Sequence, residues 1–371
     1  MNPARITLLV TGATGFLGSA IAADLLENHP AVDLLFLVRA GSAEEGLRRL
    51  REKVAVMTES SAALARLKSA MILCGDLELF PALLGDARVQ SITHVLNSAA
   101  LASFAWKKEV WTVNVDHTTA FAKAIATLPA MRRFLYVGTA MISGNTEHQS
   151  VQEDQFPSAV RQFVPYTRSK AEIERLLPEL LGPVPCVVAR PSIVVGHTRL
   201  GCRPSPSIFW IFRMIHAARK IPFPAHHRID VIPVDYCARA LIHLTLKPEL
   251  QHARYHVSAG SQHSCTFAAI DRAYSRVKNE ENIEPLAEFD VADLPGLEPQ
   301  FNAWFGPGNS RHLLSAIHIY RAFAGLNVTF DNQRLLVEGM EAPPTFADYL
   351  DVCIRTGEAD PIAEQMLCDF R

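Results

Sequence analysis

A glycine-rich turn near the start of the sequence constrains this chain more than any other feature. The turn follows an apolar run, Ile6–Thr11, and opens a helical pattern, Phe16–Asn28. Glycine permits the backbone angles of a tight turn and lets a pyrophosphate approach the backbone closely. Phosphates bind favourably at the N–H groups of a helix N-terminus. The turn therefore predicts a dinucleotide site formed by Thr11, Gly12, Thr14, Gly15, Phe16, Leu17 and Gly18.

Short apolar runs alternate with longer helical patterns through the first half of the chain. The further runs are Leu34–Val38, Met71–Leu73, His94–Asn97, Phe134–Val137 and Cys186–Ala189, and the further helical patterns are Ala43–Met57, Ala105–Leu128 and Pro165–Leu181. Runs that are apolar throughout are typical of parallel strands buried on both faces. This alternation predicts an α/β fold with a Rossmann-type, doubly wound parallel sheet.

The pattern changes after Gly196. A helical stretch at Pro204–Lys220 precedes a short extended piece, Asp230–Val234, and is followed by a helix at Val234–Leu246 and a strand at Tyr255–Ser258. Beyond these, the chain is mostly helical. We therefore expect a cofactor-binding core over residues 1–260, of which 200–225 contribute to the substrate side. Residues 261–371 are expected to form a smaller, mostly helical substrate-binding cap.

Composition limits the class of protein. Of the 371 residues, 49% are hydrophobic and 20% are charged, which excludes general disorder. A formal net charge of −2 argues against nucleic acid and anionic lipid as partners, and no apolar run is long enough to span a bilayer. The seven cysteines are scattered without a paired motif. This pattern is typical of reduced thiols in a cytoplasmic protein and gives no indication of a metal site.

An arginine follows the second predicted strand, where an acidic residue would bind the ribose hydroxyl of NAD. Arg39 instead suits the 2′-phosphate of NADPH, and Arg49 on the following helix would supply a second cation. The alternative is that Arg39 is a solvated surface residue. We favour NADPH as the cofactor.

Tyr166 and Lys170 lie four residues apart in a helical stretch and therefore share one face. A nearby ammonium is expected to stabilise the tyrosinate and so lower the pKa of the phenol. Thr139 follows the fifth strand, at the edge of the sheet where ligands bind. Hydroxyl, phenol and ammonium together would polarise a carbonyl beside a nicotinamide, although Thr139 could also be only a strand-end cap.

These motifs resemble the extended short-chain dehydrogenase/reductases. The glycine turn, the Tyr-Thr-Arg-Ser-Lys run at 166–170 and Arg190–Gly196 all match stretches of that superfamily. The resemblance implies further cofactor contacts at Asp76, Leu77, Ser98, Ala99, Pro191, Ser192 and Ile193, besides Tyr166 and Lys170. It also implies that Asn114, which stands in an Asn-Val-x-x-Thr context, supports the proton relay.

Within that superfamily the chain resembles the thioester reductase and fatty acyl-CoA reductase group. The similarity lies in Leu37–Ala40, Phe134–Ala140, Ile229–Asp235 and the stretch Phe346–Cys353. It implies reduction of an acyl thioester, carried by coenzyme A or by a carrier protein, to an aldehyde and then to an alcohol. Thr139, Tyr166, Lys170 and Asn114 would form the catalytic group.

Other interpretations stay open. The same fold could serve a dehydrogenase, a ketoreductase or an epimerase acting on a ketone, a hydroxyl or a sugar nucleotide. A non-catalytic NADPH-binding module is a further alternative. Ser207–Met214 is either a wall of the acyl site or part of a core helix, and the run Ala225–Arg228 either meets a pantetheine phosphate or is a solvated loop. Cys202 is expected to be structural.

Overall fold

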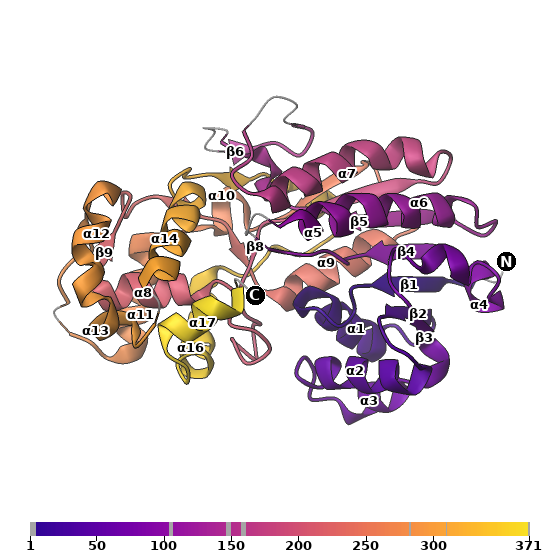
Figure 1. Ribbon diagram of the computed structural model, residues 1–371, viewed down its shortest axis with the longest axis horizontal. Helices are drawn as coiled ribbons and strands as arrows, with labels where there is room; N and C mark the ends of the chain where they lie inside the picture. Colours follow the sequence, from indigo (N-terminus) through magenta and orange to yellow (C-terminus); the bar gives the residue numbers. More distant parts are fainter. Residues whose placement is uncertain are drawn as a thin grey trace.

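A seven-stranded, all-parallel sheet forms the centre of the molecule in the computed structural model (Figure 1). The structure describes residues 5–103, 107–145, 150–156, 161–281, 283–308 and 310–369. In spatial order the strands are β12 (Arg254–Val257), β7 (Cys186–Pro191), β5 (Arg133–Val137), β4 (His94–Asn97), β1 (Thr7–Thr11), β2 (Asp33–Val38) and β3 (Ile72–Cys74). The predicted Rossmann-type sheet is confirmed.

Helices cover both faces of the sheet because its strands bury apolar side chains on both sides. One face carries α1 (Phe16–Asn28), α2 (Ala43–Ala55), α3 (Ser61–Arg66) and α9 (Val234–Leu246), and the other carries α5 (Lys108–Trp111), α6 (Thr118–Ala126) and α7 (Pro165–Leu181). Successive residues of β1 separate accordingly, since Leu8 and Val10 join the first apolar cluster whereas Leu9 joins the second.

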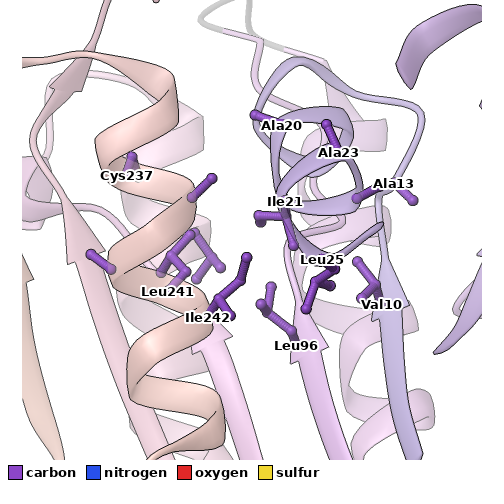
Figure 2. Close-up of a cluster of buried hydrophobic side chains, with 14 of the residues drawn as sticks. Val10, Ala13, Ala20, Ile21, Ala23, Leu25, Leu96, Cys237, Leu241 and Ile242 are labelled. Atoms are coloured by element: carbon purple, nitrogen blue, oxygen red, sulfur yellow. The ribbon is translucent and has the colours of Figure 1, made fainter. Parts of the chain in front are cut away.

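Helices α1 and α9 lie side by side on the sheet. Figure 2 shows Ile21 and Leu25 of α1 and Leu241 of α9 meeting above Val10 and Leu96 of the strands. All five side chains are fully buried. This packing fixes the start of α1, and therefore the glycine turn, against the edge of the sheet.

A second group of helices gathers at one end of the molecule (Figure 1). It comprises α8 (Phe209–Ala218), α11 (Phe267–Lys278), α12 (Leu294–Leu297), α13 (Phe301–Phe305), α14 (Ser310–Ala324), α16 (Phe346–Gly357) and α17 (Ile362–Asp369). These helices share one apolar cluster. The expected helical cap is therefore present, while the division of the chain at residue 260 stays a prediction.

Short strand pairs join the remaining segments. They are β6 (Ser150–Val151) with β15 (Thr329–Phe330), β8 (Ile193–Val194) with β11 (Val231–Ile232), β9 (Lys220–Ile221) with β14 (Ala287–Glu288), and β10 (Arg228–Ile229) with β13 (Cys265–Thr266). The remaining short helices are α4 (Ala87–Gln90), α10 (Gly260–His263) and α15 (Gln333–Val337). Segments beyond residue 320 thus return to the core, because β15 pairs with β6 and Leu335 joins the cluster under α1.

Two predicted helices differ from the observed ones. The helix expected over Ala105–Leu128 is interrupted by η3 (Thr112–His117), a π-helical segment between α5 and α6; residues 104–106 lie outside the described residues. The helix expected over Pro204–Lys220 begins only at Phe209, and Lys220 belongs to β9. The Pro residues at 204 and 206 disfavour helical backbone in the residues before them, which accounts for the late start.

Candidate active site

A cavity of about 940 Å³ lies along the carboxyl ends of the central strands. Such an edge is where open α/β sheets bind ligands. All but two of the predicted site residues line it: Thr11, Gly12, Thr14, Gly15, Phe16, Leu17, Gly18, Arg39, Asp76, Leu77, Ser98, Ala99, Thr139, Tyr166, Lys170, Pro191, Ser192 and Ile193. Residues from separate parts of the chain therefore meet at one site.

The glycine turn is a tight cradle. Gly12 has a φ of +70°, and a Cβ there would lie 2.7 Å from the Ala99 nitrogen. A Cβ at Gly18 would lie 2.0 Å from the Gly12 carbonyl oxygen, so only glycine fits between strand and helix. At Gly15 a Cβ would meet only the Gly12 oxygen, at 3.3 Å, because this glycine borders the cavity. The residues present therefore fit a dinucleotide whose phosphates approach the N-terminus of α1.

Thr11 joins the turn to the neighbouring strand. Its hydroxyl donates to Asn97 Oδ1 at 2.6 Å and accepts from the Ala99 backbone N–H at 3.2 Å. Ser98 Oγ donates to the Thr11 carbonyl at 2.7 Å. These bonds hold the segment after β4 beside the glycine turn, so that both border the cavity.

Lys170 lies almost fully buried behind the cavity wall. Its Nζ donates to the Val137 carbonyl at 2.7 Å and lies 4.7 Å from the centre of the Tyr136 ring. Burial lowers the pKa of Lys170 from 10.5 to about 7, an effect partly opposed by the carboxylate of Glu174. The ammonium is thus fixed in place at the end of β5, where its charge is sensitive to its neighbours.

Tyr166 lies half-buried on the same face of α7, and Lys170 Nζ is 5.9 Å from the centre of its ring. Burial raises the pKa of Tyr166 to about 12. The expectation that the lysine lowers this pKa is therefore wrong for the protein without cofactor, because loss of hydration outweighs the ammonium. A phenol with this pKa keeps its proton at neutral pH and can act as a hydrogen-bond donor.

Thr139 borders the cavity and also begins a turn. Its hydroxyl accepts a hydrogen bond from the Met141 backbone N–H at 3.3 Å, which caps the short helix η4 (Ala140–Ser143). The two alternatives from the sequence are therefore compatible: the residue caps a turn and is present at the ligand edge. Its hydroxyl proton can point elsewhere, because the capping bond uses only an oxygen lone pair.

Asn114 and Arg49 do not line the cavity. Asn114 lies on η3, where its amide bonds the backbone N–H and C=O of Leu101, at 2.7 and 3.1 Å, and Ser169 Oγ at 3.0 Å. It therefore connects the loop after β4 to helix α7. Arg49 donates to the Arg39 carbonyl and so supports the backbone of a lining residue instead of reaching the cavity.

The structure also assigns the residues that the sequence left open. Ser207 and Ile208 line the cavity, whereas the following residues of α8 are buried in the apolar cluster of the cap. The Arg228 guanidinium bonds the backbone carbonyls of Ser261 and Ser264. Cys202 is buried outside the cavity lining.

Two aromatic residues of the cavity were missed from the sequence. Tyr320 and Phe323, one turn apart on α14, bring the cap to the catalytic end of the cavity. Phe323 packs against Phe163, just before α7, with ring centres 5.1 Å apart. No motif marks them, since α14 has an ordinary amphipathic pattern and lies some 150 residues from Tyr166.

Two structural findings concern the rest of the chain. Within the described ranges, no helix combines the length and the apolar character that crossing a bilayer requires. Among those same residues, no cluster of three or more His, Cys, Asp or Glu side chains is arranged to hold a metal ion.

The fold and the site define a Rossmann-type, NAD(P)-binding reductase of the extended short-chain dehydrogenase/reductase class. Residues 10–241 match the family described as male sterility protein, and the chain belongs to that NAD-binding family.

Known proteins resemble the chain in sequence and in fold. A linear gramicidin synthase polypeptide of Brevibacillus parabrevis is 28% identical over 94% of the chain, which spans 7% of that synthase polypeptide. The chain also spans 24% and 31% of two fungal nonribosomal peptide synthetases, of Aspergillus hancockii and a Cladobotryum species, which are 27% and 28% identical to it.

Solved structures share the fold. The terminal R domain from the myxalamid PKS-NRPS biosynthetic pathway superposes with a TM-score of 0.75 at 20% identity, covering 96% of this chain and 91% of that domain. UDP-glucuronic acid 4-epimerase from Bacillus cereus, in complex with NAD, superposes with a TM-score of 0.62 at 16% identity, covering 95% and 96%. A reductase domain and an epimerase therefore share this architecture.

Proposed function

We propose that this protein is an NADPH-dependent reductase that converts an acyl thioester to an aldehyde. The observation that carries the proposal is a single cavity in which the glycine turn, the Tyr166–Lys170 pair and the aromatic residues of α14 meet. The first two suit a nicotinamide dinucleotide and a carbonyl. Tyr320 and Phe323 add an apolar wall on the cap side, as an acyl chain requires.

Arg39 supports NADPH over NADH. Its exposed guanidinium lies at the end of β2 and lines the cavity, while no acidic residue stands at that position. Arg49 holds the backbone of Arg39 through its carbonyl oxygen. An exposed guanidinium on a supported backbone suits the 2′-phosphate of NADPH.

The residues act on the carbonyl oxygen of the thioester. NADPH, when bound, supplies the hydride for the carbonyl carbon. Tyr166 and Thr139 donate hydrogen bonds to the oxygen as it gains negative charge, and such preorganised donors commonly supply the largest single contribution to catalysis. Lys170 keeps positive charge beside Tyr166. Collapse of the tetrahedral adduct expels the thiolate and leaves the aldehyde, and a second round of reduction would give an alcohol.

The thioester would arrive on a pantetheine arm, either of coenzyme A or of a carrier protein. Similarity to a peptide synthase polypeptide over 94% of the chain supports the carrier-protein form. Coenzyme A presents the same arm, so both are candidates for the same cavity.

A dehydrogenase or epimerase is the second candidate, because an NAD-bound epimerase shares the fold with a TM-score of 0.62. The test is consumption of NADPH with acyl-coenzyme A and acyl-pantetheine thioesters, sugar nucleotides and ketones, with NADH in parallel. We expect NADPH loss with thioesters, together with stoichiometric free thiol. Turnover only with ketones or sugar nucleotides would overturn the thioester proposal.

A further inference from the structure

The immediate surroundings of Lys170 contain two buried residues that do not line the cavity. Tyr136 lies on β5, and Glu174 lies one turn beyond Lys170 on α7. Both are about 1% exposed, and both lie outside the cavity lining. The proposed reaction gives them no part, although both act on the ammonium.

Tyr136 presents its ring to the lysine. Lys170 Nζ lies 4.7 Å from the ring centre, closer than the 5.9 Å that separates it from the ring of Tyr166. A desolvated ammonium over an aromatic face is stabilised by the negative face of the ring. The Tyr136 hydroxyl is buried and makes no hydrogen bond with a described residue, so the ring is the part of the side chain that interacts.

Glu174 places a negative charge on the same helix. Its carboxylate binds the buried Arg190 through two hydrogen bonds, at 2.5 and 3.1 Å, and also contacts Arg254 at 3.3 Å. Arg190 is followed directly by Pro191, Ser192 and Ile193, which line the cavity. This ion pair therefore ties the helix that carries Tyr166 and Lys170 to the strand that leads into the cofactor segment.

We propose that Tyr136 and Glu174 are positioning residues that together hold the Lys170 side chain in place and in its charged state. The assignment rests on the proposed function for its catalytic meaning, but not for the state of the lysine itself. With Val137 accepting one N–H bond, the ring and the carboxylate compensate for the hydration that the buried ammonium has lost. Burial still lowers the pKa of Lys170 to about 7, so loss of either neighbour has a measurable effect.

Other titratable or charged groups lie on the elements around Lys170. On α7 they include Tyr166, and on β7 they are Cys186 and Arg190. The helical segments packed on α7 carry Lys108, Glu109, Asp116, His117 and Lys123. Of all these groups, Glu174 is the one whose charge opposes the fall in the pKa of Lys170.

The experiment is a pH titration of the Lys170 ammonium by NMR in cofactor-free protein, followed by the pH profile of kcat. In Glu174→Gln the titration should move to lower pH by about one unit, because an opposing charge is lost and Arg190 is left without its partner. Tyr136→Leu should move it in the same direction, while Tyr136→Phe, which keeps the ring, should not. Glu172→Gln, on the same helix and paired with Arg175, is the matched control.

The alkaline limb of the kcat profile should shift in parallel with the titration. A thermal melt establishes which variants are folded, and the Tyr136 pair provides the test if Glu174→Gln does not fold. An unchanged Lys170 titration in folded Glu174→Gln, or equal titrations in Tyr136→Leu and Tyr136→Phe, overturns the proposal. Absence of thioester reduction by the wild-type protein would instead overturn the proposed function, and the titration would still report on Lys170.

Discussion

At the scale of single residues, the two ionisable groups of the site are shifted in opposite directions. Burial raises the pKa of Tyr166 to about 12 and lowers that of Lys170 to about 7. The phenol therefore holds its proton throughout the physiological range, whereas the lysine titrates within it. This combination suits the reduction of a carbonyl, in which the tyrosine begins as a donor.

Tyr166→Phe tests the role of that donor. The change removes one hydroxyl from the cavity wall and leaves the ring, so the turnover of thioester should fall by about 10²- to 10⁴-fold. The Kd for NADPH, measured by fluorescence titration, should stay within about twofold, because the glycine turn is unchanged. Turnover within a factor of ten of wild type would remove Tyr166 from its proposed role.

Arg39→Ala tests cofactor choice. Loss of a charged hydrogen bond to a phosphate should weaken NADPH binding by about ten- to a hundredfold and leave NADH binding unchanged. Arg48→Ala, on the exposed face of α2 and paired with Glu52, is the control. Equal weakening of both cofactors would contradict a contact between Arg39 and the 2′-phosphate.

At the scale of elements, a π-helical segment joins α5 to α6 and places Asn114 between two parts of the site. π-Helical turns occur frequently at functional sites. Here the asparagine bonds the Leu101 backbone on one side and Ser169 on the other, and Ser169 in turn donates to the Tyr166 carbonyl at 2.7 Å. The catalytic helix and the cofactor loop are thus held together through one side chain.

Asn114→Ala should lower the free energy of unfolding by about 1–3 kcal/mol, because the Leu101 backbone groups lose their partners. Chemical denaturation measures this change. Asp116→Ala, on the exposed side of the same segment, should change the stability by less than about 0.5 kcal/mol. If the two variants are equally stable, the amide bonds of Asn114 do not stabilise the fold.

The elements that the sequence predicted well are those whose apolar pattern is local. Helices α1, α7 and α9 and strand β4 have the predicted bounds, because packing on the sheet follows their own periodicity. The π-helical segment could not be predicted, since one extra residue in a turn leaves the apolar pattern of Ala105–Leu128 nearly unchanged. Most of the predicted cavity residues lie beside sheet strands or glycine turns, whereas Tyr320 and Phe323 depend on how a distant helix packs.

At the scale of the whole molecule, buried charges join segments that lie far apart in the sequence. Glu153 is 2% exposed and accepts the backbone N–H groups of His256, on β12, and Arg334, on α15, at 2.9 and 3.2 Å. Burial raises the pKa of Glu153 to about 7. The folded protein therefore retains a proton here at pH values where the unfolded chain has lost it.

This shift predicts how stability depends on pH. Because the folded pKa lies above the unfolded value, the contribution is fully present below about pH 4.5 and is lost as pH rises through about 7. Relative to Glu153→Gln, the wild type should lose about 3 kcal/mol of unfolding free energy across that window. Asp154→Asn, which is largely exposed, serves as the control. Parallel pH profiles for wild type and Glu153→Gln would contradict the raised pKa.

The central claim is that hydride passes from NADPH to the carbonyl carbon of a thioester in this cavity. The most direct test uses NADPH deuterated at the transferable position, an acyl-pantetheine thioester, and mass spectrometry of the product. The account predicts an aldehyde with one deuterium at its carbonyl carbon and one equivalent of free thiol. An aldehyde without deuterium, or free thiol released without NADPH oxidation, would contradict it.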